Sequence, residues 1–108
     1  MKKWQQAEKR DAKTFGTTQQ RGSGNQDHYP SDSFSDSLII ETKQTDKASY
    51  SITLERWQKL LDEAAVLDAK DKRLRIPIMS LHIQNKHLVV IEAEDFNHIM
   101  QIYDSPKV

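Results

Sequence analysis

The sequence predicts a single α/β domain over residues 1–108, with a central mixed β-sheet of about five strands flanked by helices. Two observations predict this class. Segments with apolar residues at helical spacing alternate along the chain with short β-branched runs. A chain of 108 residues with 36% apolar residues can also form one modest core. We expect residues 1–3 and 104–108 to be flexible ends of the domain.

The first helix is predicted over about residues 3–15, with Gly16 as its stop. Its apolar side chains, which share one helical face, are Trp4, Ala7, Ala12 and Phe15. Residues 22–37 follow and are rich in Gly, Ser, Asn and Asp. This composition predicts a long loop, with a short strand near Phe34.

Two strands are expected next, at about residues 37–43 and 48–52. Thr53 is a good N-cap for a helix over about residues 54–69. The apolar stripe of that helix consists of Leu54, Trp57, Leu60, Leu61, Ala64 and Leu67.

The remainder of the chain predicts a β-hairpin and a short helix. The hairpin strands span about residues 75–84 and 87–92 and are joined at residues 85–86. Residues 88–91, Leu-Val-Val-Ile, are typical of a buried strand. The last helix begins near Glu94, since acids suit a helix N-terminus. Its apolar residues are Phe96, Ile99, Met100 and Tyr103.

Charge is unevenly distributed, although the formal net charge is zero. Residues 1–21 carry six Lys or Arg and two acids, whereas residues 22–41 carry four acids and no Lys or Arg. This pattern suits a protein that binds a phosphate backbone with one surface and a divalent cation with another. The alternative interpretation is a solvated tail beside a polar loop, which gives the same charge pattern. The absence of Cys excludes disulfides, thiolate zinc sites and Cys nucleophiles.

A carboxylate and an ammonium directly follow the apolar run at residues 38–40. Glu41 and Lys43 are two residues apart and therefore share one face of the strand, while Thr42 points to the other. Such a pair serves phosphodiester hydrolysis, because the carboxylate binds Mg²⁺ and the Lys orients or activates the attacking water. The metal needs at least one more acid. Three candidates lie upstream, namely Asp27, Asp32 and Asp36.

We favour Asp32 as the second acid. Asp32 lies nine residues before Glu41, which leaves room for a tight turn that sets the two carboxylates side by side on antiparallel strands. Asp36 has the wrong parity if the strand already runs there, and Asp27 lies deeper in the loop. Both stay open as alternatives.

One pattern consists of Asp32, eight intervening residues and then Glu41-Thr42-Lys43. It resembles the PD-(D/E)XK nuclease signature. The surrounding residues 21–24 (RGSG), 38–40 (LII) and 45–50 (TDKASY) are similar to those of small Holliday junction resolvases of the archaeal type and their phage-encoded relatives. The resemblance covers about residues 4–92. One departure is that Ser31 and Ser33 flank the Asp, where the family commonly has Gly and an apolar residue.

The resemblance implies a restriction-endonuclease-like fold and a DNA endonuclease that resolves four-way junctions in recombination and repair. It implies Mg²⁺ as cofactor, with Mn²⁺ able to substitute, no other small-molecule cofactor, and a homodimer. The sequence contains no apolar run as long as a signal peptide or a membrane span requires. We therefore expect a cytoplasmic protein without a membrane partner. If the protein is phage-encoded, we expect it in the cytoplasm of the host.

The resemblance also implies site residues. Glu8, in the segment QAEKR, matches a helix glutamate that joins the metal site, and it has no basic residue at i+3 or i+4 to pair with. The alternative to a metal-binding role for Glu8 is that its neighbours Lys9 and Arg10 keep this face of the helix in contact with solvent. Ser23 matches a loop beside the scissile phosphate. The catalytic set is thus Glu8, Ser23, Asp32, Glu41 and Lys43, with Glu8, Asp32 and Glu41 as metal ligands. The expected DNA contacts are Arg10, Lys13, Arg21, Gly22, Gly24 and Lys47.

Other interpretations stay open. A related endonuclease that cuts mismatches, flaps or specific sequences fits the same residues, and so does a DNA-binding or protein-binding module without chemistry. The histidines show no metal spacing and are typical of surface or satisfied core positions. These are His28, His82, His87 and His98, of which His28 borders the proposed site. The basic cluster at residues 70–75 is typical of a charged turn after a helix, or contacts DNA.

Overall fold

The computed structural model describes residues 2–19 and 33–106, and every structural statement below refers to these residues. The chain forms a small α/β fold in which helices flank a mixed β-sheet, as the sequence predicts. In chain order the elements are α1 (Lys3–Phe15), β1 (Thr18–Gln19), β2 (Ser33–Phe34), β3 (Leu38–Thr45), α2 (Leu54–Asp71), β4 (Ile76–Ile83), β5 (Lys86–Val90) and α3 (Ala93–Asp104).

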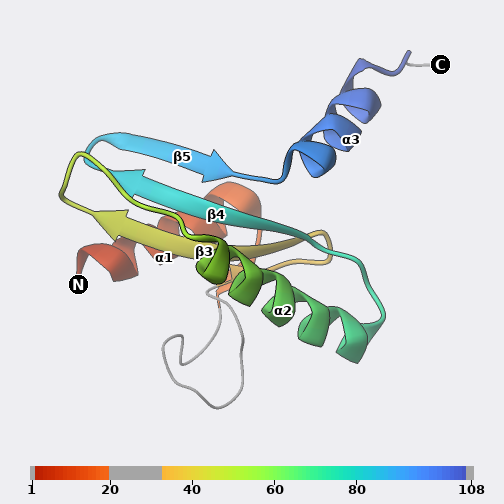
Figure 1. Cartoon of the computed structure of the whole chain (residues 1–108), viewed down its shortest axis with the longest axis horizontal. Coiled ribbons are helices and arrows are strands. Elements are labelled where there is room, and N and C mark those ends of the chain that lie inside the picture. The colour runs from red at the N-terminus through yellow and green to blue at the C-terminus, as the bar shows by residue number, and fades with distance from the viewer. Residues whose placement is uncertain (1, 20–32, 107–108) are drawn as a thin grey trace.

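The sheet has the strand order β1-β2-β3-β4-β5, and its two first strands are only two residues long each. The pair β3–β4 is parallel and the other pairs are antiparallel. A parallel pair needs a crossover connection, which α2 supplies. Figure 1 shows α1 and α2 on opposite faces of the sheet, while α3 projects away beyond β5.

The alternation of side chains along β3 decides what each helix covers. Ile39 is fully buried and packs with Ala64 and Leu67 of α2. Thr42 points to the other face, where its hydroxyl donates to Asp11 of α1 at 2.6 Å. Because Glu41 and Lys43 share the parity of Ile39, they lie on the α2 side of the sheet. The predicted parity of this strand is therefore confirmed.

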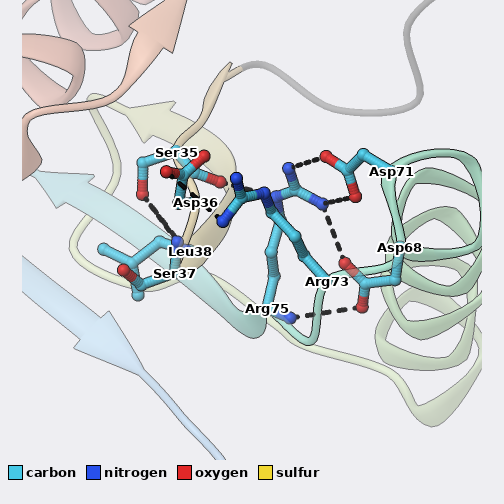
Figure 2. A network of polar contacts seen from close by, with 8 residues as sticks. All are labelled: Ser35, Asp36, Ser37, Leu38, Asp68, Asp71, Arg73 and Arg75. Atoms are coloured by element: carbon cyan, nitrogen blue, oxygen red, sulfur yellow. Dashed lines mark hydrogen bonds and ion pairs between the residues drawn. The ribbon is translucent and has the colours of Figure 1, made fainter.

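Arg75 joins three segments at the end of the sheet where β4 begins (Figure 2). Its side chain is 1% exposed and lies 2.9 Å from Asp68 and in contact with Asp71, both in the last turns of α2. Its Nε donates to the carbonyl of Ser35, in the turn between β2 and β3. The hydrogen bond from Arg75 holds the pKa of Asp71 below its ordinary value. The network fixes the end of α2 against the sheet.

Three sequence predictions are corrected by the fold. Residues 48–52 form no strand, because the two large side chains of this run, Tyr50 and Ile52, do not enter the core. Residues 88–91 are not a buried strand, since β5 lies at the sheet edge with Leu88 and Val89 exposed.

The α2 stripe is also narrower than predicted. Leu54 is 88% exposed, and the buried positions of the helix are Leu60, Ala64 and Leu67. The first turn of α2 therefore contributes no buried apolar residue. Within the described part of the chain, no helix has the length and apolar character needed to cross a bilayer.

Candidate functional site

Glu41 and Lys43 lie next to one another on the α2 side of β3. Lys43 Nζ is 2.9 Å from Glu41 Oε1, and both side chains are half-buried. Their neighbours in the parallel strand, Met79 and Leu81, are buried and provide an apolar floor. An ion pair above an apolar floor is less screened than a pair in open water. The sequence pattern thus correctly placed these two charges on one face.

The pair lines a cleft of about 210 Å³ between β3, β4 and the first half of α2. The helix adds three charged residues to its lining, Arg56, Lys59 and Glu63. Arg56 is positioned by Tyr50, because its Nη1 donates to the Tyr50 hydroxyl and its guanidinium lies 5.8 Å from the ring centroid. The cleft therefore combines carboxylates that suit a hard cation with cations that suit phosphate oxygens.

The charged residues of α2 were not recognised as site residues from the sequence. Their spacing of i, i+3 and i+7 places them on one side of the helix, and this spacing is the signal that was available. What the sequence does not reveal is that this side faces Glu41, since that depends on the crossover geometry between β3 and β4.

The other predicted site residues of the described chain are dispersed. Glu8 is buried on α1, the helix that packs on the Thr42 face of β3, so the structure does not bring it together with Glu41 on the α2 face. Arg10 is exposed and lines a second cleft with His82 and His87. Lys13 and Lys47 are exposed. Asp36, an alternative acid, is exposed and lies 3.5 Å from Arg73.

Seven residues named in the sequence predictions lie outside the described residues. They are Arg21, Gly22, Ser23, Gly24, Asp27, His28 and Asp32. The described chain resumes at Ser33, which pairs with Ile40, the residue before Glu41.

A second polar cluster lies on the opposite face of the sheet, between α1 and the β4–β5 hairpin. Asp11 is 0% exposed, and its Oδ1 lies 2.7 Å from His82 Nε2 and 3.0 Å from His87 Nε2. Its Oδ2 accepts the hydrogen bond from Thr42. The two imidazole rings stack with centroids 4.1 Å apart and an interplanar angle of 18°. The prediction of a surface or satisfied core position describes His82, which is buried and bonded to Asp11, but it did not anticipate that both histidines contact the same carboxylate.

The sequence contains one signal for the histidine pair. His82 and His87 are cross-strand partners in the antiparallel pair β4–β5, so their side chains share a face. Asp11 comes from a helix 71 residues earlier than His82 and reaches them only through the tertiary fold.

The environment of His87 disfavours its charged form. Burial lowers the pKa of His87, and the charge of His82 lowers it further, while Asp11 opposes both effects. Ser80 Oγ also lies 2.7 Å from His87 Nε2. The arrangement is not a Ser-His-Asp catalytic triad, because one nitrogen of His87 faces both the hydroxyl and the carboxylate. Ser80 is moreover fully buried and closed to a substrate.

Comparison with known proteins identifies no relative: no protein-family model, no curated protein and no solved structure matches the chain. The functional argument therefore depends on the side chains of the two clefts. For the Glu41–Lys43 cleft, the donor atoms are carboxylate oxygens, which is the ligand type that Mg²⁺ prefers, so the residues present fit this ion.

Proposed function

We propose that the chain is a Mg²⁺-dependent DNA endonuclease with a restriction-endonuclease-like fold, and that it cuts four-way junctions by phosphodiester hydrolysis. The observation that supports this best is the Glu41–Lys43 pair, 2.9 Å apart, in a cleft that Arg56 and Lys59 also line. Metal-dependent hydrolysis of a phosphodiester uses a metal-binding carboxylate, a cation near the attacking water and further cations for the phosphate charge. The described part of the cleft contains each of these groups.

Glu41 would hold the metal, with Asp32 as the further ligand that the family resemblance implies, whereas Glu8 lies on α1, on the opposite face of the sheet, and is not part of this ligand set. The strand register supports the choice of Asp32, because Ser33 pairs with Ile40 and the two acids are the sequence neighbours of these residues. Glu63 provides another carboxylate in the lining of the same cleft. Mn²⁺ suits the same oxygen donors. When bound, the ion would lower the pKa of a coordinated water and offset charge on the phosphate.

The remaining roles belong to the cations of the chain. Lys43, held against Glu41, would orient the attacking water and offset the charge that develops during attack. Arg56, fixed by Tyr50, and Lys59 would bind the non-bridging phosphate oxygens. Ser23 would lie beside the scissile phosphate. Contacts to the DNA backbone would come from Arg10, Lys13, Arg21, Gly22, Gly24 and Lys47.

The test is cleavage of a labelled synthetic four-way junction and of a matched linear duplex, with Mg²⁺ or with EDTA. We expect paired, symmetric nicks in the junction alone, and no cleavage with EDTA. Glu41→Gln and Lys43→Ala should each lower the rate by about 100-fold or more, because each removes a group that acts on the reacting atoms. Glu55→Gln and Lys70→Ala make the same chemical changes at exposed α2 positions outside the cleft lining and should leave the rate unchanged.

Each other outcome contradicts a defined part of the proposal. Cleavage that survives both cleft variants would show that the active site lies elsewhere. Equal cutting of linear, flap and junction DNA would replace the junction specificity with that of a broader endonuclease. Binding of the junction without cleavage in Mg²⁺ or Mn²⁺ would leave only a DNA-binding module.

A further inference from the structure

We propose that Asp11, His82 and His87 form a binding site for a divalent transition-metal ion of the Zn²⁺ type, separate from the Glu41–Lys43 cleft. One ligand atom from each of these residues lies within 4.8 Å of the other two. Two imidazole nitrogens and one carboxylate oxygen are a common ligand set for such ions, at distances of about 2.0–2.2 Å. Since Asp11 Oδ1 is already 2.7 and 3.0 Å from the two nitrogens, only small outward movements would admit an ion.

The ligands are held in place by the fold. Thr42 donates to Asp11 Oδ2 at 2.6 Å and leaves Oδ1 directed at the histidines. The stacking of the two rings, with centroids 4.1 Å apart, keeps both Nε2 atoms on the same side of the hairpin. Hydrogen bonds from neighbouring groups orient metal ligands in the same way and raise metal affinity. The Thr42–Asp11 contact is such a bond.

An ion can reach the cluster from solvent. His82 and His87 line a cleft of about 260 Å³ between α1 and the β4–β5 hairpin. The side chain of His87 is 27% exposed, whereas that of Asp11 is fully buried beneath it. Three protein ligands with an open side leave a fourth position for water, as in zinc sites with a free coordination position.

The choice of metal follows from the donor atoms. Imidazole nitrogen suits Zn²⁺, Co²⁺ and related ions, while Mg²⁺ prefers an all-oxygen set such as the carboxylates of the Glu41–Lys43 cleft. The two sites lie on opposite faces of the sheet, because Thr42 and Glu41 are adjacent in β3. They should therefore load independently with different ions.

Calorimetric titration of the full chain with Zn²⁺, after removal of bound metal with EDTA and dialysis, tests the proposal. We expect one Zn²⁺ per chain and no competition from millimolar Mg²⁺. His87→Ala should weaken Zn²⁺ binding at least tenfold, whereas His98→Ala, which removes an exposed histidine of α3, should leave it unchanged. Glu41→Gln should also leave it unchanged, so that this result is distinguishable from a failure of the proposed nuclease activity.

A Co²⁺ titration of the wild-type chain gives a second readout that needs no variant. Visible absorption bands of low-symmetry, nitrogen-containing coordination should appear at one equivalent and disappear on addition of Zn²⁺. Absence of Zn²⁺ binding by the wild-type chain would overturn the proposal, and so would equal weakening in the His87 and His98 variants. In either case the cluster would be a buried hydrogen-bond network that ties α1 to the hairpin.

Discussion

Arg75 shows how one residue of a largely basic segment acquires a structural role. Residues 70–75 contain four basic side chains, which in the sequence are typical of a charged turn or a DNA contact. The structure buries Arg75 against Asp68, Asp71 and the carbonyl of Ser35, whereas Arg73 is half-exposed. A guanidinium can satisfy these acceptors at once because its donors form a fixed planar fork.

We expect Arg75→Met to lower the free energy of unfolding by about 3 kcal/mol, because it leaves Asp68, Asp71 and the Ser35 carbonyl without their buried donor. The loss for Arg75→Lys should lie between zero and that of Arg75→Met, since one ammonium cannot replace all the donors of the guanidinium fork. Arg73→Met is the control, with an expected loss of at most about 0.5 kcal/mol, because its pair with Asp36 is 3.5 Å long and exposed. Urea denaturation of the three variants measures these differences. Equal losses at both positions would show that the buried network does not stabilise the fold.

At the scale of elements, α2 has two well-defined ends. It begins as the sequence predicts, with Thr53 accepting a hydrogen bond from the backbone N–H of Arg56 at 3.1 Å. It ends at Lys72, whose φ of 58° and ψ of 42° lie in the left-handed region while its N–H bonds to the carbonyl of Asp68. Glycine is the residue that adopts this conformation without strain, and Lys72 is exposed.

Lys72→Gly should therefore stabilise the chain by about 0.5–1 kcal/mol, because it removes the conformational cost of a Cβ at a positive φ. Lys70→Gly, two residues earlier and inside the helix, should destabilise it by about 1 kcal/mol. Thermal unfolding followed by circular dichroism compares the two. Destabilisation of both variants to the same extent would mean that the C-terminal conformation of α2 differs from the one described.

How far the sequence predicts each element depends on whether its signal is local. The three helices and the Glu41–Lys43 face were predicted well, because helical spacing, the Thr53 cap and strand parity are properties of neighbouring residues. The exposure of β5 was not predicted, because apolar composition does not distinguish an edge strand from a central one. The Asp11–His82–His87 cluster was missed because three separate elements form it, and only the tertiary fold brings them together.

At the scale of the whole molecule, one end of the chain leaves apolar surface uncovered. The helix α3 has no buried residue, and it projects away from the sheet beyond the end of the edge strand β5 (Figure 1). The exposed large apolar side chains of these two elements are Leu88, Val89, Phe96, Ile99, Ile102 and Tyr103. A helix that leaves several large apolar side chains exposed, as α3 does, marks an interaction site.

We propose a second copy of the chain as the partner for this surface. The proposed cleavage of a four-way junction requires two symmetric cuts, which a two-fold dimer provides with the same surface on both subunits. The edge strand β5 is suited to this symmetry, because an antiparallel pair of identical strands is itself two-fold. The Glu41–Lys43 cleft lies between β3 and α2, so this contact would leave both clefts open to DNA.

Ile99→Asp should then convert the dimer to a monomer, because it places a carboxylate in the apolar contact. Leu74→Asp is the matched control, since Leu74 is 92% exposed in the turn between α2 and β4 and lies outside this surface. Light scattering coupled to size-exclusion chromatography measures the mass of each variant. In the junction assay, the monomeric variant should give single, unpaired nicks at a reduced rate, because the two cuts are no longer coupled through one assembly. A wild-type chain that elutes as a monomer at micromolar concentration would contradict the dimer, and paired nicks would then require two chains to meet on the DNA itself.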